Sequence, residues 1–212
     1  MKVCEIFTSV QGESSYAGLP CTFVRLSGCN LRCIYCDTQY SYDQGLEMSV
    51  GEIMNHVTLV GLNLVEITGG EPLLQEAETL QLTGQLLEEG YKVLIETNGS
   101  LSIKDIDRRA VIILDVKTPG SGMYAEMDVT NFGFIKPFDE IKFVICGRED
   151  YDWAKNIITE HKLKGRCKLL FSPALGMVDP AVLARWIVAD RLEVRLNVQI
   201  HKYIFGPDER MV

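Results

Sequence analysis

Residues 22–36 read TFVRLSGCNLRCIYC, a short apolar run followed by three closely spaced cysteines. The run at 22–26 has the length and the apolar character of a buried strand. Cys29, Cys33 and Cys36 come next at a three-then-two spacing, and no fourth cysteine lies nearby. The stretch therefore predicts a strand that ends in a loop of candidate metal ligands.

Further runs of the same kind alternate with helical patterns along the rest of the chain. Strands are expected at 63–68, 91–96, 111–116, 140–145, 167–171 and 194–200. Helix signals between them are a capping box at Ser49 and Glu52, an amphipathic stretch from Gln75 to Glu89 that stops at Gly90, and an N-cap at Asp179 before Pro180. This alternation predicts an α/β fold with a parallel sheet. A full eight-unit barrel takes about 250 residues, so about six strand-helix units predict an incomplete (β/α) barrel.

Composition limits the class of protein. With 212 residues, 47% of them apolar, the chain can bury one sizeable core, and we expect a single domain over 1–212. A net charge of -8 argues against direct binding of nucleic acid. No apolar run has the length of a signal peptide or a membrane span, so we expect a cytoplasmic protein with no membrane partner. In that reducing compartment, Cys4, Cys21, Cys146 and Cys167, which lack ligand spacing, are expected to be buried thiols.

Unusual motifs follow the expected strands one after another. They are TGGEP at 68–72, ETNG at 96–99, DVKTPGSG at 115–122, FSPALG at 171–176 and QIHKYIF at 199–205. Because the carboxyl ends of parallel strands meet at one edge of the sheet, these motifs and the cysteines are expected to surround one site.

Three cysteines can serve more than one purpose. A structural zinc site needs four ligands, and the nearest histidine, His56, lies in an expected helix. An iron-sulfur cluster also takes four thiolates as a rule. Three thiolates would leave one iron open to a small molecule, and this interpretation is favoured over zinc or incidental thiols.

The stretch CNLRCIYC resembles the CxxxCxxC signature of radical S-adenosylmethionine (SAM) enzymes, and TGGEP follows it as in that superfamily. The resemblance implies a [4Fe-4S] cluster held by Cys29, Cys33 and Cys36, with SAM on its open iron. It also implies SAM contacts from Tyr35, Cys36, Asp37, Gly69, Gly70, Glu71, Asn98, Asp115, Lys117 and Ser172. Taken alone, a GGEP or Asn-Gly segment is more often simple turn chemistry.

Residues 5–33, EIFTSVQGESSYAGLPCTFVRLSGCNLRC, resemble the opening of the 7-carboxy-7-deazaguanine synthase family, and the likeness extends to QIHKYIFGP at 199–207. The family implies a homodimeric carbon-nitrogen lyase of queuosine and 7-deazapurine biosynthesis. It converts 6-carboxy-5,6,7,8-tetrahydropterin to 7-carboxy-7-deazaguanine by hydrogen abstraction, ring contraction and loss of ammonia. SAM is regenerated, Mg²⁺ assists, and a one-electron donor such as flavodoxin or ferredoxin supplies the electron.

The family's substrate contacts match Val10, Gln11, Gly12, Glu13, Arg25, Thr68, His201 and Val212, and its magnesium ligand matches Thr38. Several of these residues also have an ordinary structural interpretation. Arg25 lies in an apolar run and needs an anionic partner, which is either the substrate carboxylate or an internal acid. Thr38 would otherwise be a helix cap, and His201 a histidine of the core or rim. Ser14 departs from the family's pattern, which has glycine there.

Two alternative functions would leave different signatures in the sequence. A radical SAM activase, which acts on a protein partner, should lack the QGE and QIHK segments. A non-catalytic iron-sulfur sensor would have no use for GGEP and ETNG.

Overall fold

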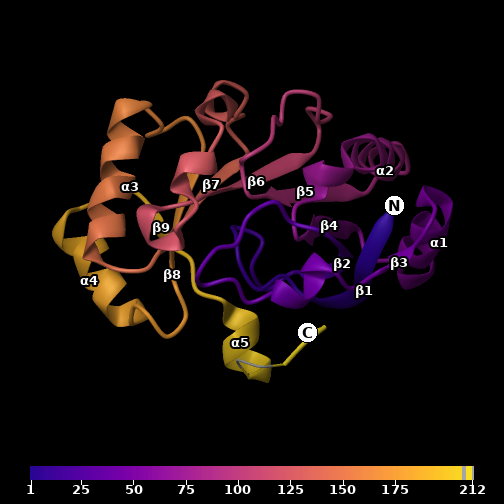
Figure 1. Ribbon diagram of the computed structural model, residues 1–212, viewed down its shortest axis with the longest axis horizontal. Coiled ribbons are helices and arrows are strands. Elements are labelled where there is room, and N and C mark those ends of the chain that lie inside the picture. Colours follow the sequence, from indigo (N-terminus) through magenta and orange to yellow (C-terminus); the bar gives the residue numbers. More distant parts are fainter. Residues whose placement is uncertain (207–208, 212) are drawn as a thin grey trace.

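The computed structural model describes residues 1–206 and 209–211, and these form a nine-stranded sheet in the order β3-β1-β2-β4-β5-β6-β7-β8-β9 (Figure 1). The strands are β1 Lys2–Val10, β2 Pro20–Leu26, β3 Leu46–Glu47, β4 Leu64–Gly69, β5 Lys92–Thr97, β6 Val111–Val116, β7 Glu140–Ile145, β8 Lys168–Pro173 and β9 Arg195–Leu196. The α-helices are α1 Val50–Val60, α2 Glu76–Glu88, α3 Arg148–Glu160, α4 Pro180–Ala189 and α5 Ile200–Phe205.

The sheet has a parallel part and an antiparallel edge. Strands β2 and β4 to β9 are parallel, whereas β1 runs antiparallel to β2 and β3 runs antiparallel to β1. Pairing ends at β3 on one side and at β9 on the other, so the sheet curves without closing. The predicted incomplete barrel is confirmed.

Helices cover the outside of this sheet, although not at every crossover. Helices α1 to α4 lie at the periphery of the molecule (Figure 1). In the described chain, α-helices fill four of the six parallel crossovers; residues 98–110 connect β5 to β6 as a loop, and residues 117–139 connect β6 to β7 through short 3-10 helices. The expected strand-helix alternation is therefore correct in the first two and the last two crossovers and wrong in the two between them.

The predicted helix ends are confirmed by local hydrogen bonds. Ser49 and Glu52 form the capping box that begins α1, and the side chain of Asp179 accepts a hydrogen bond from Ala181 N at the start of α4. The first residue of α4 is Pro180, which has no N–H to leave unsatisfied. No helix in the described ranges is long and apolar enough to cross a lipid bilayer.

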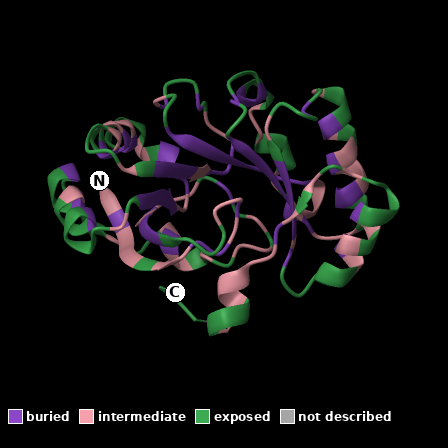
Figure 2. Cartoon of the chain, turned by 180° about the vertical axis from the view of Figure 1, so that it is seen from behind, coloured by how far each residue is buried: buried purple, intermediate pink, exposed green. Residues whose placement is uncertain are grey.

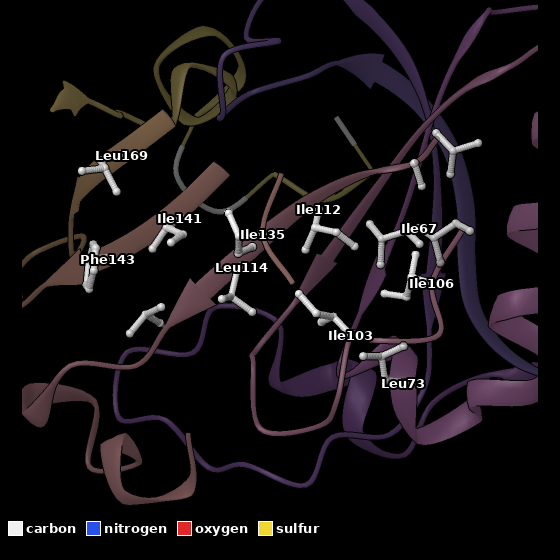
Figure 3. Packing of buried hydrophobic residues seen from close by; sticks show 14 of the residues in the cluster. Ile67, Leu73, Ile103, Ile106, Ile112, Leu114, Ile135, Ile141, Phe143 and Leu169 are labelled. Carbon is white, nitrogen blue, oxygen red and sulfur yellow. The ribbon is translucent and has the colours of Figure 1, made fainter. Parts of the chain in front are cut away.

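The two faces of the strands differ in what they bury. One set of alternating residues packs against the helices; Ile67, Leu114 and Phe143 are examples (Figure 3). The other set faces the barrel interior, where Cys21, Phe23, Leu64, Leu94, Val111 and Ile113 form a small apolar floor. Figure 2 shows the buried strands at the centre and exposed residues along the outer faces of the helices. Above the apolar floor the interior becomes polar, and this polar part holds the site.

The two ends of the chain differ from the sequence-based expectations. Lys2–Val10 forms β1, a strand that was not predicted, and the expected strand at 194–200 shrinks to β9, Arg195–Leu196. After β9 the chain turns toward the N-terminal loop, where Ile200 N donates to Gly12 O at 2.8 Å. Residues 200–205 then form the short helix α5, so His201 lies on a helix and not at the end of a strand.

Candidate active site

A cavity of about 450 Å³ lies at the carboxyl ends of the parallel strands and extends into the barrel. It collects most of the residues that the sequence singled out: Val10, Gln11, Gly12, Glu13, Arg25, Cys29, Cys33, Tyr35, Cys36, Asp37, Thr38, Thr68, Gly69, Gly70, Asn98, Asp115, Lys117, Ser172 and His201. Val212 lies outside the described residues. The placement of the motifs at one edge of the sheet is as predicted.

Cys29, Cys33 and Cys36 line this cavity as half-buried free thiols. Cys36 N donates to Cys33 O at 3.2 Å, and Leu31 N donates to Cys29 Sγ at 3.4 Å, so the loop is folded around the three side chains. Burial raises the pKa of the Cys29 and Cys33 thiols. In the described residues, no three His, Cys, Asp or Glu side chains are grouped as the ligands of a single metal ion would be.

Gly69 and Gly70 bring the end of β4 against the cysteine loop. Gly69 has a φ of 143°, and a Cβ there would lie 2.2 Å from Leu26 O. A Cβ on Gly70 would lie 1.9 Å from Gly28 O. Only glycine allows this backbone approach, so both glycines are required to hold the TGGEP segment beside the cysteines.

Glu71 differs from its expected role. Its side chain is fully buried and lies outside the cavity lining. Its carboxylate accepts hydrogen bonds from Leu73 N at 2.9 Å, Thr97 Oγ1 at 2.8 Å and Asn98 N at 2.7 Å. Glu71 thus ties the TGGEP segment to the ETNG segment, and its side chain does not line the cavity.

A buried ion pair and an aromatic ring stand beside the cysteines. Lys117 Nζ lies 2.9 Å from Asp115 Oδ2 and 5.6 Å from the centre of the Tyr35 ring. Burial opposes the charge on Lys117, but Asp115 nearby raises its pKa above the ordinary value. The other oxygen of Asp115, Oδ1, is buried and has no hydrogen-bond partner in the described part of the chain. Such an atom is costly unless a ligand satisfies it.

The N-terminal loop at 10–13 enters the barrel and contacts α5. A Cβ on Gly12 would lie 1.8 Å from His201 Nδ1, which shows how closely the loop and the histidine ring pack. Burial lowers the pKa of His201, so the ring is neutral over a wider pH range than usual. Glu13 accepts a hydrogen bond from Gln199 Nε2 at 2.8 Å.

Lys142 of β7 gathers three carboxylates on the cavity wall. Its Nζ contacts Glu13 Oε2 at 3.0 Å, Asp115 Oδ2 at 3.5 Å and Glu96 Oε1. Burial opposes the charge of Lys142, yet Glu13, Glu96 and Asp115 together raise its pKa well above the ordinary value. One buried ammonium therefore contacts three acids in a confined space, and Asp115 also pairs with Lys117.

Glu66 of β4 is a fourth interior acid and contacts Gln11 instead of a cation. Gln11 Nε2 donates to Glu66 Oε2, and Gln11 Oε1 accepts from Glu13 N. The Glu66 side chain is buried, and the residue is 2% exposed. Burial is the main cause, and the negative charge of Glu96 the second, of a pKa of Glu66 that is raised to about 8.

Arg25 has an internal partner. Its Nε donates to Glu5 Oε1 at 2.7 Å, and its guanidinium lies 5.8 Å from the centre of the Phe7 ring. The residue also lines the cavity. Both alternatives left by the sequence are therefore compatible with the structure, because Glu5 takes one side of the guanidinium while the rest faces the cavity.

Thr38 and Asp37 follow the last cysteine of the loop. Thr38 occupies the residue before a short 3-10 helix, Gln39–Tyr42, but its side chain makes no capping hydrogen bond, which removes the ordinary explanation for it. Asp37 accepts hydrogen bonds from Lys202 Nζ and from Gln199 Nε2 at 3.3 Å. Asp37 thus connects the cysteine loop to α5.

The remaining cysteines are less uniform than expected. Cys21 is buried, whereas Cys4, Cys146 and Cys167 are half-buried. Ser14, which replaces the family's glycine, has a φ of 61°, and its Oγ accepts from Tyr16 N at 3.0 Å.

Five charged residues of the site were not predicted: Glu5, Glu66, Glu96, Lys142 and Lys202. The sequence holds a signal for the four that lie on strands, because each is a charge inside a mostly apolar strand, as Arg25 is.

Comparisons with known proteins agree with this geometry. Residues 23–170 match the model of the Radical SAM superfamily. A relative from Koribacter versatilis named 7-carboxy-7-deazaguanine synthase is 44% identical, with 100% of each chain covered. One of the same name from Chlorobaculum tepidum is 43% identical, covering 100% of this chain and 97% of the relative. The crystal structure of QueE from Escherichia coli has a similar fold, with a TM-score of 0.78 at 22% identity over 93% of each chain. The chain belongs to the radical SAM superfamily and, within it, to the 7-carboxy-7-deazaguanine synthase family.

Proposed function

We propose that this protein converts 6-carboxy-5,6,7,8-tetrahydropterin to 7-carboxy-7-deazaguanine with release of ammonia. The observation that carries the proposal is one cavity in which three free half-buried thiols lie together with Arg25 and the N-terminal loop at 10–13. The full-length relatives named above bear the synthase name, and neither an activase nor a sensor is supported by them.

The cysteine loop and its neighbours fit the cofactors of the superfamily. Cys29, Cys33 and Cys36 would hold the [4Fe-4S] cluster. Their half-buried sulfurs are the kind of ligand that binds iron in such a cluster. The cluster and SAM, when bound, supply an adenosyl radical that takes a hydrogen atom from the substrate and returns it. The glycines of TGGEP hold the backbone of that segment against Cys29, where it would meet a ligand's amino group, and the unpartnered Oδ1 of Asp115 offers an acceptor.

Four further groups would surround SAM beside the cysteines. Lys117, kept charged by Asp115, would bind its carboxylate, and the Tyr35 ring would pack against its adenine. Asn98, whose amide donates to Asn30 Oδ1 at 3.1 Å, would face its ribose. Ser172, hydrogen-bonded by Asn197 Nδ2 at 2.8 Å, stands on the opposite wall.

The substrate would lie between Arg25 and the N-terminal loop. Arg25 would hold the carboxylate on C6 with the nitrogens that Glu5 leaves free, in a charge-assisted contact. Backbone groups of Val10, Gln11 and Gly12 would line the ring, with Thr68 and His201 on either side. The apolar wall of Phe7 and Phe23, whose rings stack at 4.9 Å, would keep the reacting ring away from solvent.

Magnesium, a second subunit and an electron donor complete the proposal. Thr38 would give one oxygen to Mg²⁺, and the substrate carboxylate and water would supply the rest of the shell. We further propose a homodimer, and flavodoxin or ferredoxin as the one-electron donor.

The test is an anaerobic assay with the reconstituted protein, SAM, a reductant and the carboxy-tetrahydropterin. We expect 7-carboxy-7-deazaguanine and ammonia in equal amounts, with SAM not consumed. Loss of pterin without the deazapurine would contradict the proposal. Cleavage of SAM only in the presence of a protein partner would instead support the activase.

A further inference from the structure

Glu66 lies deeper in the barrel than the residues proposed to hold the substrate carboxylate. Arg25 of β2 is paired in register with Thr68 of β4, and Phe23 is paired with Glu66. Glu66 therefore lies two residues before Thr68 on the same face of the strand, about 7 Å further from the cavity mouth. A flat two-ring ligand whose carboxylate contacts Arg25 would direct its opposite edge toward Glu66.

The carboxyl group of Glu66 is only partly engaged by the protein. Gln11 Nε2 donates to Oε2, and the orientation of that amide is fixed because its oxygen accepts from Glu13 N. Among the described residues, Glu66 Oε1 has no hydrogen-bond partner, and no ammonium or guanidinium lies within 4.0 Å of the carboxyl group. A side chain that is 2% exposed and lines a cavity in this way faces a site for hydrogen-bond donors.

The other interior acids each contact a cation, and Asp115 contacts a second one, Lys117, at 2.9 Å. Glu13, Glu96 and Asp115 share the ammonium of Lys142, whereas Glu66 is left without a cation.

The charged and titratable groups that face Glu66 come from each element around it: Glu96 of β5, Glu13 of the N-terminal loop, Lys142 of β7 and the Cys21 thiol of β2. Burial and the two glutamates outweigh Lys142 and Gln11, so the pKa of Glu66 is raised to about 8. Near neutral pH the ligand-free group carries a proton.

We infer that Glu66 is a specificity-determining residue, which binds the 2-amino and N3 hydrogens of the pterin edge as a carboxylate and releases its own proton to solvent when the ligand binds. The inference rests on the proposed function. Two parallel N–H groups match the two oxygens of a carboxylate, and each oxygen has lone pairs for two donors, so Gln11 need not be displaced. The ligand keeps all its hydrogens, and the departing proton is the one held by Glu66.

This mechanism makes binding depend on pH in one direction. N–H donors stabilise the ionised form, so the pKa of Glu66 falls when the ligand binds. Below a pH of about 8, each molecule of ligand must displace a proton, and the affinity should rise about tenfold per pH unit until that pH and then level off.

Calorimetric titration tests the inference without turnover. The anaerobically reconstituted, SAM-loaded protein is titrated with the carboxy-tetrahydropterin in the absence of reductant, between pH 6 and 9, in buffers of different ionisation enthalpy. We expect release of about one proton per ligand at pH 7. The variant Glu66→Gln keeps the size and the Gln11 contact; it should release no proton, bind about ten- to a hundredfold more weakly at pH 8 and lose the pH slope.

Two controls test whether Glu66 contacts the 2-amino edge of the pterin ring. An analogue with oxygen in place of the 2-amino group presents an acceptor to Glu66; it should bind the unaltered protein about ten- to a hundredfold more weakly than the pterin, and Glu66→Gln should lose most of this discrimination. Glu140→Gln changes another buried glutamate, one that accepts from Ser15 N at 3.1 Å, and should retain the proton release.

The outcomes separate the inference from the function. Binding of the pterin with no proton release, or with the same release in Glu66→Gln, overturns the role of Glu66 and leaves the proposed function standing. Absence of pterin binding together with absence of deazapurine formation overturns both.

Discussion

Arg25 and Glu5 face each other across β1 and β2, with the guanidinium Nε 2.7 Å from the Oε1 of the glutamate. Tyr40 donates its hydroxyl proton to the same oxygen at 2.9 Å. The glutamate thus holds one edge of a guanidinium whose other edge is open to the cavity. This arrangement fixes the direction of a charge that can then bind a carboxylate bidentately.

The first prediction concerns Arg25→Ala. Loss of a charge-assisted contact of about 1.5–3 kcal/mol should raise the KM for the pterin by about one to two decades with little change in kcat. Steady-state kinetics measure this, with the circular dichroism spectrum as a check of folding. Glu5→Gln is the matched control. This variant keeps the guanidinium of Arg25 but holds it less firmly, so the KM for the pterin should rise less than in Arg25→Ala. A folded Arg25→Ala protein with an unchanged KM would show that the Arg25–Glu5 pair is purely structural.

The second prediction concerns Cys33→Ala. Removal of one of three thiolates should prevent cluster assembly, which iron and sulfide analysis and the visible absorption spectrum report directly. Cys146→Ala is the control, since this thiol is also half-buried and free but lies after β7, outside the cysteine loop. A full complement of four irons in Cys33→Ala would remove Cys33 from the set of ligands.

The third prediction concerns Ser14, which occupies the left-handed region at a φ of 61°. Relief of the backbone strain by glycine gains about 1 kcal/mol, while loss of the hydrogen bond from Tyr16 N costs about 0.5–1.5 kcal/mol. Because the two nearly cancel, Ser14→Gly should leave the free energy of unfolding almost unchanged. Ser14→Ala keeps the strain and loses the hydrogen bond, so chemical denaturation should show it about 1 kcal/mol less stable. Equal stability of the alanine variant would mean that the serine hydroxyl contributes nothing to this loop.

The strands and motif positions could be predicted because they depend on local patterns. The run at 111–116 is apolar except for Asp115, and Gly90 ends the pattern of α2; both features act over a few residues. The cysteine loop was recognisable because its spacing is independent of the rest of the fold.

What could not be predicted depends on contacts between distant segments. The chain after β9 turns into α5 because Gly12, nearly two hundred residues earlier, accepts a hydrogen bond from Ile200 N. In the same way, Glu71 has the sequence of a ligand-binding residue, but its carboxylate is used by Thr97 and Asn98. The pairing of Lys142 with Glu13 likewise requires the loop at 10–13 to enter the barrel.

The last prediction concerns this Lys142 cluster. In Lys142→Met, Glu13, Glu96 and Asp115 lose their shared ammonium, and breaking a buried ion pair by removing one partner costs about 3–5 kcal/mol. Asp115 keeps its ion pair with Lys117, but Glu13 and Glu96 have no other cation within 4.0 Å among the described residues. These two carboxylates can then remain buried only by taking up protons, so their pKa values in the folded state rise above those in the unfolded state. The folded variant therefore binds more protons than the unfolded chain, and its stability should fall as the pH rises above the ordinary glutamate pKa of about 4.3.

Urea denaturation at several pH values measures this slope, and Lys155→Met, which removes a partly exposed lysine from its contact with Asp190, should change it little. A variant at Lys142 that is as stable as the unaltered protein at pH 8 would show that the three acids do not depend on the ammonium.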